Sequence, residues 1–177
     1  MEGILNAQVR MEKPKVSRRE GFIPGVIYGK DLENIFVKFE KTKLIGLLKE
    51  KGEKSRISFL LNNKKQEGII KDVARDDSTN EIIHIDIQAV KGTEVVKWTV
   101  PVNFTGKELL NGRGLYLQVY SNEIEVEGES SLIPNSVEIE VSKMEFGQEI
   151  KIKDLKLTGE IRILKDLDTV IGVIANS

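Results

Sequence analysis

The run from Ile82 to Gln88 constrains the fold most, because isoleucines alternate in it with polar residues. Side chains alternate between the two faces of a β-strand, so this period of two predicts a strand with the isoleucines at 83, 85 and 87 in a core. Three polar side chains then form a row on the opposite face: His84, Asp86 and Gln88. Ile82 falls on this polar face and makes the pattern imperfect. A polar row on a rigid sheet can bind another molecular surface.

Other short alternating runs surround this strand in the first half of the chain. They predict strands at 5–9, 24–29, 35–39, 56–61 and 68–75. Leucine and isoleucine at helical spacing predict a helix over 41–51, with Gly52 as its stop. The run 62–65 is typical of a hairpin turn. Several short strands with one or two helices favour a small β-barrel.

The second half has the pattern of an all-β domain. A long β-rich run covers 95–104, and further strand-like runs follow at 115–120, 123–127, 136–141, 148–152, 160–164 and 169–175. The glycine-containing segment 106–114 predicts a loop, and we expect a short helical turn near Asp154. Trp98, Phe104 and Phe146 are predicted core residues. The fold class is therefore mainly β, with a barrel domain over 1–91 and an all-β domain over 92–177.

Charge is distributed unevenly between the two halves. Residues 1–90 hold 17 Lys and Arg against 14 Asp and Glu, whereas residues 91–177 hold 10 against 14. The halves therefore carry +3 and −4, which indicates two modules of which only one need meet phosphate. Four glutamates of the second half alternate at 123, 125, 127 and 129 and predict a solvent-facing strand edge that deters RNA or meets a basic partner.

Composition and the first residues indicate the cellular compartment of the protein. The chain has no cysteine, which excludes disulfides and thiolate metal sites and favours a reducing interior. Residues 1–4 show no basic region followed by an apolar core, so we expect no secretory signal. No apolar run approaches the roughly 18–20 residues that span a bilayer. We expect a soluble, cytoplasmic protein.

Residues 11–22 form a basic segment that we expect to be a loop-like arm. Arg18 and Arg19 precede Gly21 and Pro24, whose backbone restrictions fix where the arginines point. Guanidinium groups pair with phosphate in bidentate fashion. Nearby cations strengthen the case for phosphate contact: Arg10, Lys13 and Lys15. The alternative is an ordinary charged surface loop.

Tyr28 and the polar row add groups that can recognise RNA. If Ile27 faces inward, Tyr28 faces outward, where its ring can stack on a base or ribose and its hydroxyl can bond a 2′-OH. Otherwise it is a tyrosine half-buried at a barrel end. His84 and Asp86 lie roughly 6.5–7 Å apart along a strand, which favours two separate contacts over one hydrogen-bonded pair. Their alternative reading is as ordinary solvent-facing residues.

A catalytic or metal site is hard to build from this sequence. The chain has one histidine, and at strand spacing Asp86 is too far away to orient it. The serines lie in no Gly-x-Ser-x-Gly turn, and neither common phosphate-binding glycine loop is present. A structural zinc site lacks ligands. We expect a protein that is not an enzyme and that needs no cofactor or metal.

Two motifs resemble a known family. Arg18-Arg19-x-Gly21-x-x-Pro24-Gly25-Val26-Ile27-Tyr28-Gly29, followed by His84-Ile85-Asp86, is similar to the bacterial large-subunit ribosomal protein L25 family, whose members bind 5S ribosomal RNA. In the second half, Val100-Pro101-Val102, Gly112-x-Gly114 and Ile133-Pro134 resemble the extra β domain of the longer members, the Ctc or general stress protein type.

The resemblance implies a barrel docked in the minor groove of the non-Watson–Crick loop region of 5S RNA. The RNA-contacting positions of the family fall on Arg10, Arg18, Tyr28, His84 and Asp86, with Lys71 as a further polar position and Lys13 or Lys15 as a basic residue of the arm. Together with Arg19 and Gln88, these residues form the candidate RNA-binding set. The implied protein is monomeric when free, associates with the large ribosomal subunit and contacts neighbouring ribosomal proteins through its second domain.

Two alternatives remain open on the sequence alone. Barrels of this kind also occur as anticodon-binding domains beside glutaminyl-tRNA synthetase, so the chain can be a tRNA-binding module, although a synthetase catalytic domain does not fit in its length. The other alternative is a β-rich protein-interaction module in which RNA contact is incidental. Its support is the net negative charge of the second half.

Overall fold

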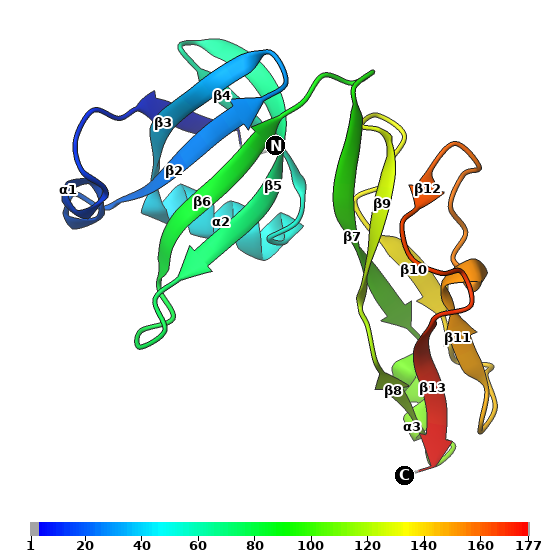
Figure 1. Ribbon diagram of the computed structural model, residues 1–177. Helices are drawn as coiled ribbons and strands as arrows, with labels where there is room; N and C mark the ends of the chain where they lie inside the picture. The colour runs from blue at the N-terminus through cyan, green and yellow to red at the C-terminus, as the bar shows by residue number, and fades with distance from the viewer. Residues whose placement is uncertain (1–3, 177) are drawn as a thin grey trace. The chain divides into compact units, whose positions relative to one another are not determined.

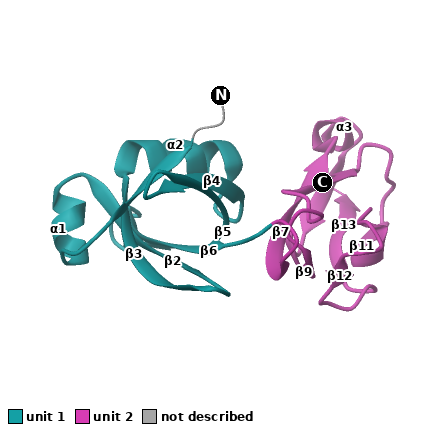
Figure 2. Ribbon diagram, turned by 90° about the horizontal axis from the view of Figure 1, so that it is seen from above, with its two compact units in different colours: residues 1–91 teal, residues 92–177 magenta. Residues whose placement is uncertain are grey.

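The computed structural model describes residues 4–176. Residues 1–3, part of the segment examined for a secretory signal, and Ser177 lie outside the described residues. The chain divides into two compact units, Met1–Lys91 and Gly92–Ser177 (Figure 2). The first contains a closed barrel and the second two β-sheets, so the mainly β fold class is confirmed.

Unit 1 is a six-stranded barrel with two helices (Figure 1). Its elements are β1 Leu5–Val9, α1 Pro14–Arg19, β2 Phe22–Gly29, β3 Leu32–Glu40, α2 Lys41–Lys51, β4 Arg56–Leu61, β5 Lys64–Arg75 and β6 Ile82–Ala89. The strands close in the order β1-β3-β2-β6-β5-β4. The β2–β6 and β1–β4 pairs are parallel and the others antiparallel. Figure 2 shows these strands curving around a common axis with α2 along one side.

Most of the alternating apolar residues fill the barrel as predicted, but Val9 at the end of β1 is 47% exposed. The core joins Ile27, Val37 and Phe39, all fully buried, to the buried leucines of α2 at 44, 47 and 48. Gly52 ends α2 with a φ of 89°, a left-handed conformation that glycine adopts without steric cost. Asn62 and Asn63 both have positive φ and form a two-residue hairpin turn within the predicted turn over 62–65, whose other two residues already belong to β5.

The prediction of which β6 side chains face the core was wrong at the first residues of the strand. Ile82 is buried, whereas Ile83 is only half-buried. The register explains the change, because Ile82 pairs with Arg75 and His84 with the adjacent Ala74, so Ile83 is an extra residue without an opposite partner. Such a β-bulge shifts the alternation by one position. A period of two read along one strand cannot reveal it.

The loop-like arm was also predicted wrongly. Residues 14–19 form the short helix α1, and Pro14 occupies its first turn, where a missing N–H costs nothing. Ser17 of this helix is fully buried. The arm is therefore a docked helix that fixes the direction of its cations.

Unit 2 contains two open sheets. Its strands are β7 Val95–Thr105, β8 Leu115–Val119, β9 Glu123–Glu129, β10 Val137–Glu140, β11 Glu149–Lys151, β12 Arg162–Ile163 and β13 Val170–Asn176. One sheet has the order β10-β7-β9-β12 and the other β11-β13-β8. The expected helical turn near Asp154 is the 3₁₀ helix η1 Ile152–Asp154.

Two expectations for this unit were wrong. The predicted loop contains the helix α3 Lys107–Asn111, whose Leu110 is fully buried and anchors it. Trp98 is buried as predicted, but Phe146 is 63% exposed because it lies in the turn between β10 and β11. No helix within residues 4–176 is long and apolar enough to cross a membrane.

Candidate nucleic-acid interface

A row of side chains crosses three neighbouring strands of the barrel and continues at Arg10, which directly follows β1. In register, Phe36 of β3 lies beside Val26 of β2, which lies beside Asp86 of β6. At the β1 end, the Arg10 N–H donates to the Phe36 carbonyl at 2.8 Å, and the Arg10 guanidinium lies 5.5 Å from the centre of the Phe36 ring. Side chains of one row share a face, so these strands present a cation, an aromatic ring and a carboxylate on one surface. We call this surface the polar face.

Arg10 is held tightly in this row. Its side chain is about nine-tenths buried, and its Nη1 donates to the Glu12 carbonyl at 2.5 Å. Phe36, in contrast, is 56% exposed. The ring is the accessible part of this pair, and the guanidinium supplies a positive charge directly behind it.

Tyr28 and Gln88 form the neighbouring pair on the same face, since they are partners in the parallel β2–β6 register. Both are half-buried. Partial burial raises the pKa of the Tyr28 phenol, and the charges of Asp86 and Asp72 raise it further. The phenol therefore stays protonated and can donate a hydrogen bond to an acceptor on a ligand.

The side chains of His84 and Asp86 lie in direct contact, which contradicts the expectation of two separate contacts. The His84 Nδ1 lies 2.9 Å from the Asp86 Oδ1. Side chains on one face of a strand lean along its direction, and here the two side chains meet. The carboxylate thus orients the imidazole and turns Nε2 away from it, toward whatever approaches the face.

Helix α1 joins the polar face at its β6 end. The Arg18 Nη1 lies 3.5 Å from the carbonyl of Ile83, the bulge residue next to His84. Residues from α1, β2, α2 and the β5–β6 loop line a groove of about 420 Å³ there. Its cations are Lys15, Arg18, Arg19 and Lys41, and its carboxylates are Asp76 and Glu81. Three cations of the predicted arm therefore gather in one groove beside the lone histidine.

Glu12 fastens α1 to the barrel. Its Oε1 accepts hydrogen bonds from the Lys38 ammonium at 2.8 Å and from the Ser17 hydroxyl at 2.9 Å. The bond from Lys38 is the largest cause that lowers the pKa of Glu12 to about 2, and a backbone N–H and Ser17 lower it further. Lys38 also packs over the Phe22 ring, 4.8 Å from its centre. This ionic contact holds the helix and β3 in one fixed arrangement.

Lys71 and Lys13 each contribute a backbone carbonyl as a hydrogen-bond acceptor. Lys71 is the extra residue of a second bulge, between Ile70 and Asp72, and its carbonyl accepts a hydrogen bond from Lys54 at 2.9 Å. Lys13 precedes α1, and its carbonyl accepts a hydrogen bond from the Val16 N–H of the helix at 2.9 Å. In the described part of the chain, no three His, Asp or Glu side chains lie close enough together to hold a metal ion.

Sequence reasoning missed Phe36 and Lys41. The signal for Phe36 was present, because inward Ile35 and Val37 place the residue between them on the outer face. Lys41 gave no such signal, since it opens α2 and reaches the groove only through the packing of that helix.

A barrel with a polar outer face and a docked cationic helix, followed by a second β unit, is matched by two family models. The Ribosomal L25p family matches residues 5–87, and the C-terminal domain of ribosomal protein TL5 matches residues 95–177.

Individual proteins of known identity are similar along nearly the whole chain. The large ribosomal subunit protein bL25 of Clostridium tetani is 51% identical over 177 residues, which cover all of this chain and 92% of the relative. The bL25 of Desulfitobacterium hafniense is 34% identical over 99% of this chain and 98% of its own length. That of Caldicellulosiruptor saccharolyticus is 35% identical over 89% of this chain and 77% of its own length.

The fold and these matches define a structural ribosomal protein rather than an enzyme. The chain belongs to the bL25 family of large-subunit ribosomal proteins, in its two-domain form with a TL5-type C-terminal domain. It is therefore a ribosome-associated protein.

Proposed function

We propose that unit 1 binds 5S ribosomal RNA, with the polar face in a minor groove and the cations of α1 on the flanking phosphates. The observation that carries the proposal is the contact of Arg18 with Ile83, because it joins the arginine pair to the histidine strand across 65 residues of sequence. One approaching RNA surface can then meet both groups at once.

The chemistry of the face fits RNA. The minor groove of an A-form helix is wide and shallow and displays 2′-hydroxyls and base edges. The protonated phenol of Tyr28 can donate to these groups, and the imidazole Nε2 of His84 can exchange a hydrogen bond with them. Phe36 offers an exposed ring for packing against a ribose or an unstacked base.

Asp86 has two roles in this proposal. It orients His84, and its second carboxylate oxygen can accept from a 2′-OH or a guanine amino group. A carboxylate is tolerated beside RNA here because unit 1 is net positive, with 18 Lys and Arg against 14 Asp and Glu in residues 1–91. The cations of the groove supply a salt-dependent attraction to phosphate.

Arg10, Lys13 and Lys71 have supporting roles. The Arg10 guanidinium is committed to Phe36 and to the Glu12 carbonyl, so it acts mainly through its charge and by positioning the ring. Lys13 and Lys71 add positive charge to the attraction of phosphate.

The test is the affinity of the full chain for 5S RNA, measured by gel shift at fixed salt concentration. We expect Arg18→Ala, Tyr28→Ala and His84→Ala each to lose roughly 1–3 kcal/mol, the range for one specific contact to a nucleic acid. The matched control is Arg162→Ala, because this arginine is mostly exposed and belongs to unit 2. Wild-type affinity in all three variants would exclude this interface, and a preference for tRNA in competition would favour the tRNA-binding alternative.

A further inference from the structure

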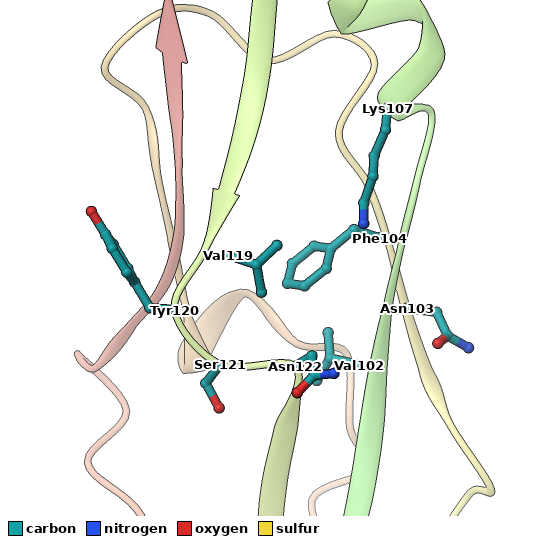
Figure 3. Close-up of a pocket in the computed structure, with 8 residues that line it drawn as sticks. All are labelled: Val102, Asn103, Phe104, Lys107, Val119, Tyr120, Ser121 and Asn122. Carbon is teal, nitrogen blue, oxygen red and sulfur yellow. The ribbon is translucent and has the colours of Figure 1, made fainter. Parts of the chain in front are cut away.

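Unit 2 has a groove between β7 and β8 that no strand of the described chain fills (Figure 3). Its volume is about 580 Å³, within the usual range of ligand sites. Phe104 and Val119 point into it from opposite sides, and the Lys107 ammonium lies 5.6 Å from the centre of the Phe104 ring. Asn122 lies at the far end from Lys107.

The β7 side of the groove is an open strand edge. β9 pairs with β7 only as far as Pro101, after which the Val102 N–H donates to the Asn122 carbonyl at 2.7 Å. β10 occupies the other side of residues 102–105. Peptide groups alternate in direction along a strand, so those of Phe104 point to the same side as the Val102 N–H, into the groove. Among residues 4–176, no strand pairs with Phe104 on that side.

The β8 side is a second open edge. Within the described chain, β8 pairs only with β13, and the Tyr120 N–H donates to the Ile171 carbonyl at 2.9 Å. By the same alternation, the peptide groups of Gln118 face β13 and those of Leu117 and Val119 face away from it. The groove thus lies between two sets of strand hydrogen-bonding groups.

We propose that this groove binds an extended polypeptide segment of a partner protein by β-strand addition. Donors and acceptors that alternate at strand spacing are matched by another peptide backbone. The segment pairs with Leu117 and Val119 on one side and with Phe104 on the other, and it packs an apolar side chain between Phe104 and Val119.

Charge favours a basic or neutral protein segment over RNA. Residues 92–177 contain 9 Lys and Arg against 14 Asp and Glu, a net charge of −5. Glu123, the first glutamate of β9, directly follows the groove residue Asn122 and is exposed. Lys107 is the single cation among the lining residues, and it packs over the Phe104 ring. The net negative charge of unit 2 as a whole disfavours the approach of phosphates.

The probe is a synthetic eight-residue peptide of alternating valine and lysine, titrated into the full ¹⁵N-labelled chain and followed by NMR. We expect the amide signals of Phe104, Leu117 and Val119 to shift together. The same peptide, N-methylated at alternate residues, keeps its side chains and charge but lacks half of its donors, and we expect it to bind at least about tenfold more weakly. Replacing its lysines by glutamates should also weaken binding.

Matched variants at one position separate the backbone from the side chain. Val119→Pro removes an N–H that does not pair with β13, so we expect the sheet to persist. The open edge of β8 loses one hydrogen-bond donor, and we expect peptide binding to weaken at least about tenfold. Val119→Thr keeps the N–H and stays within about threefold of wild type. The emission of buried Trp98 checks that unit 2 remains folded.

Four results would overturn the proposal. The first is that the peptide does not bind at millimolar concentration, and the second is that the N-methylated peptide binds equally well. The third is that the proline variant binds the peptide as wild type does. The fourth is that an eight-uridine oligonucleotide shifts these amide signals and the peptide does not. The result does not depend on RNA binding by unit 1, so the two proposals can fail separately.

Discussion

The two units of this chain differ in how completely the edges of their β-sheets are paired. Unit 1 closes its six strands into a barrel, so every strand has a neighbouring strand on both sides. Unit 2 divides its strands between sheets of four and three, and β8 ends the smaller sheet. Closure favours recognition by outward side chains in unit 1, whereas the end of a sheet at β8 leaves backbone groups for recognition in unit 2.

The units also differ in charge, and the difference agrees with this division. Unit 1 carries a net +4 and unit 2 a net −5. Polar side chains on a positive barrel suit a nucleic acid, and an open edge on a negative unit suits a polypeptide. Two units of similar length and strand content thus favour different classes of partner.

The largest expected effect is on the closure of the barrel. Gly25 of β2 pairs with Ile85 of β6, and a Cβ at Gly25 would lie 2.6 Å from the Ile85 carbonyl oxygen. Gly25→Val forces two backbones apart, and we expect it to destabilise unit 1 by about 3 kcal/mol or more. Urea unfolding followed by far-UV circular dichroism measures this loss.

The second unit and a second glycine provide the controls for that variant. The only tryptophan, Trp98, belongs to unit 2, so its fluorescence transition should not move. Gly46→Ala in α2 meets no atom within 4 Å and should stabilise the helix by about 0.5–1 kcal/mol. A shift of the Trp98 transition in the Gly25→Val variant would show that the two units unfold together and would contradict their independent unfolding.

A smaller effect is expected at the contact that docks α1. Because folding lowers the pKa of Glu12 from 4.5 to about 2, its carboxylate stabilises unit 1 above pH 4.5, and this stabilisation is lost as the pH falls toward 2. Glu12→Gln lacks the charge, so we expect it to be less stable than wild type at pH 7 and to approach wild type as the pH falls. Urea midpoints at pH 7, 4 and 3 measure the difference.

The control for Glu12 is Glu50→Gln, which changes an exposed carboxylate on α2. Its difference from wild type should stay small over the same pH range. A Glu12→Gln difference that is constant with pH would mean that the charge of Glu12 does not hold α1 in place.

The smallest effect is expected from the glutamates of unit 2. Replacing the four alternating glutamates of β9 by glutamine changes the unit from −5 to about −1, yet these residues belong to a different unit from the polar face. At physiological salt, the interaction between two exposed charges is largely screened beyond about 8 Å. We therefore expect the affinity for 5S RNA to change less than about twofold. A larger gain in a gel shift would show that unit 2 lies close enough to oppose RNA binding.

Local patterns predicted most of the strands and the main helix, because burial imposes a visible period. Lys41–Lys51 was predicted with its observed bounds, and the paired asparagines of the β4–β5 hairpin were predicted as a turn. The bulge at Ile83 was not predictable, since an extra residue becomes visible only when the opposing strand is in place. Helix α1 was missed because it is short and is held by tertiary contacts such as that of Ser17 with Glu12.

Alternation along the strand predicted the outward direction of His84 and Asp86, but it could not predict the geometry of the candidate site. The contact between these two side chains depends on side-chain torsions that the sequence does not show. The proximity of Arg18 to His84 depends on how α1 docks, and the burial of Arg10 depends on Phe36. These features arise from contacts between segments that are far apart in the sequence.

The most direct test of the central claim is an NMR titration of the labelled full chain with 5S RNA. If the polar face and α1 form one docking surface, the side-chain signals of Arg18, Tyr28 and His84 will shift with a single midpoint, while the Trp98 indole signal stays unchanged. Shifts confined to α1, with His84 and Tyr28 unaffected, would contradict the account.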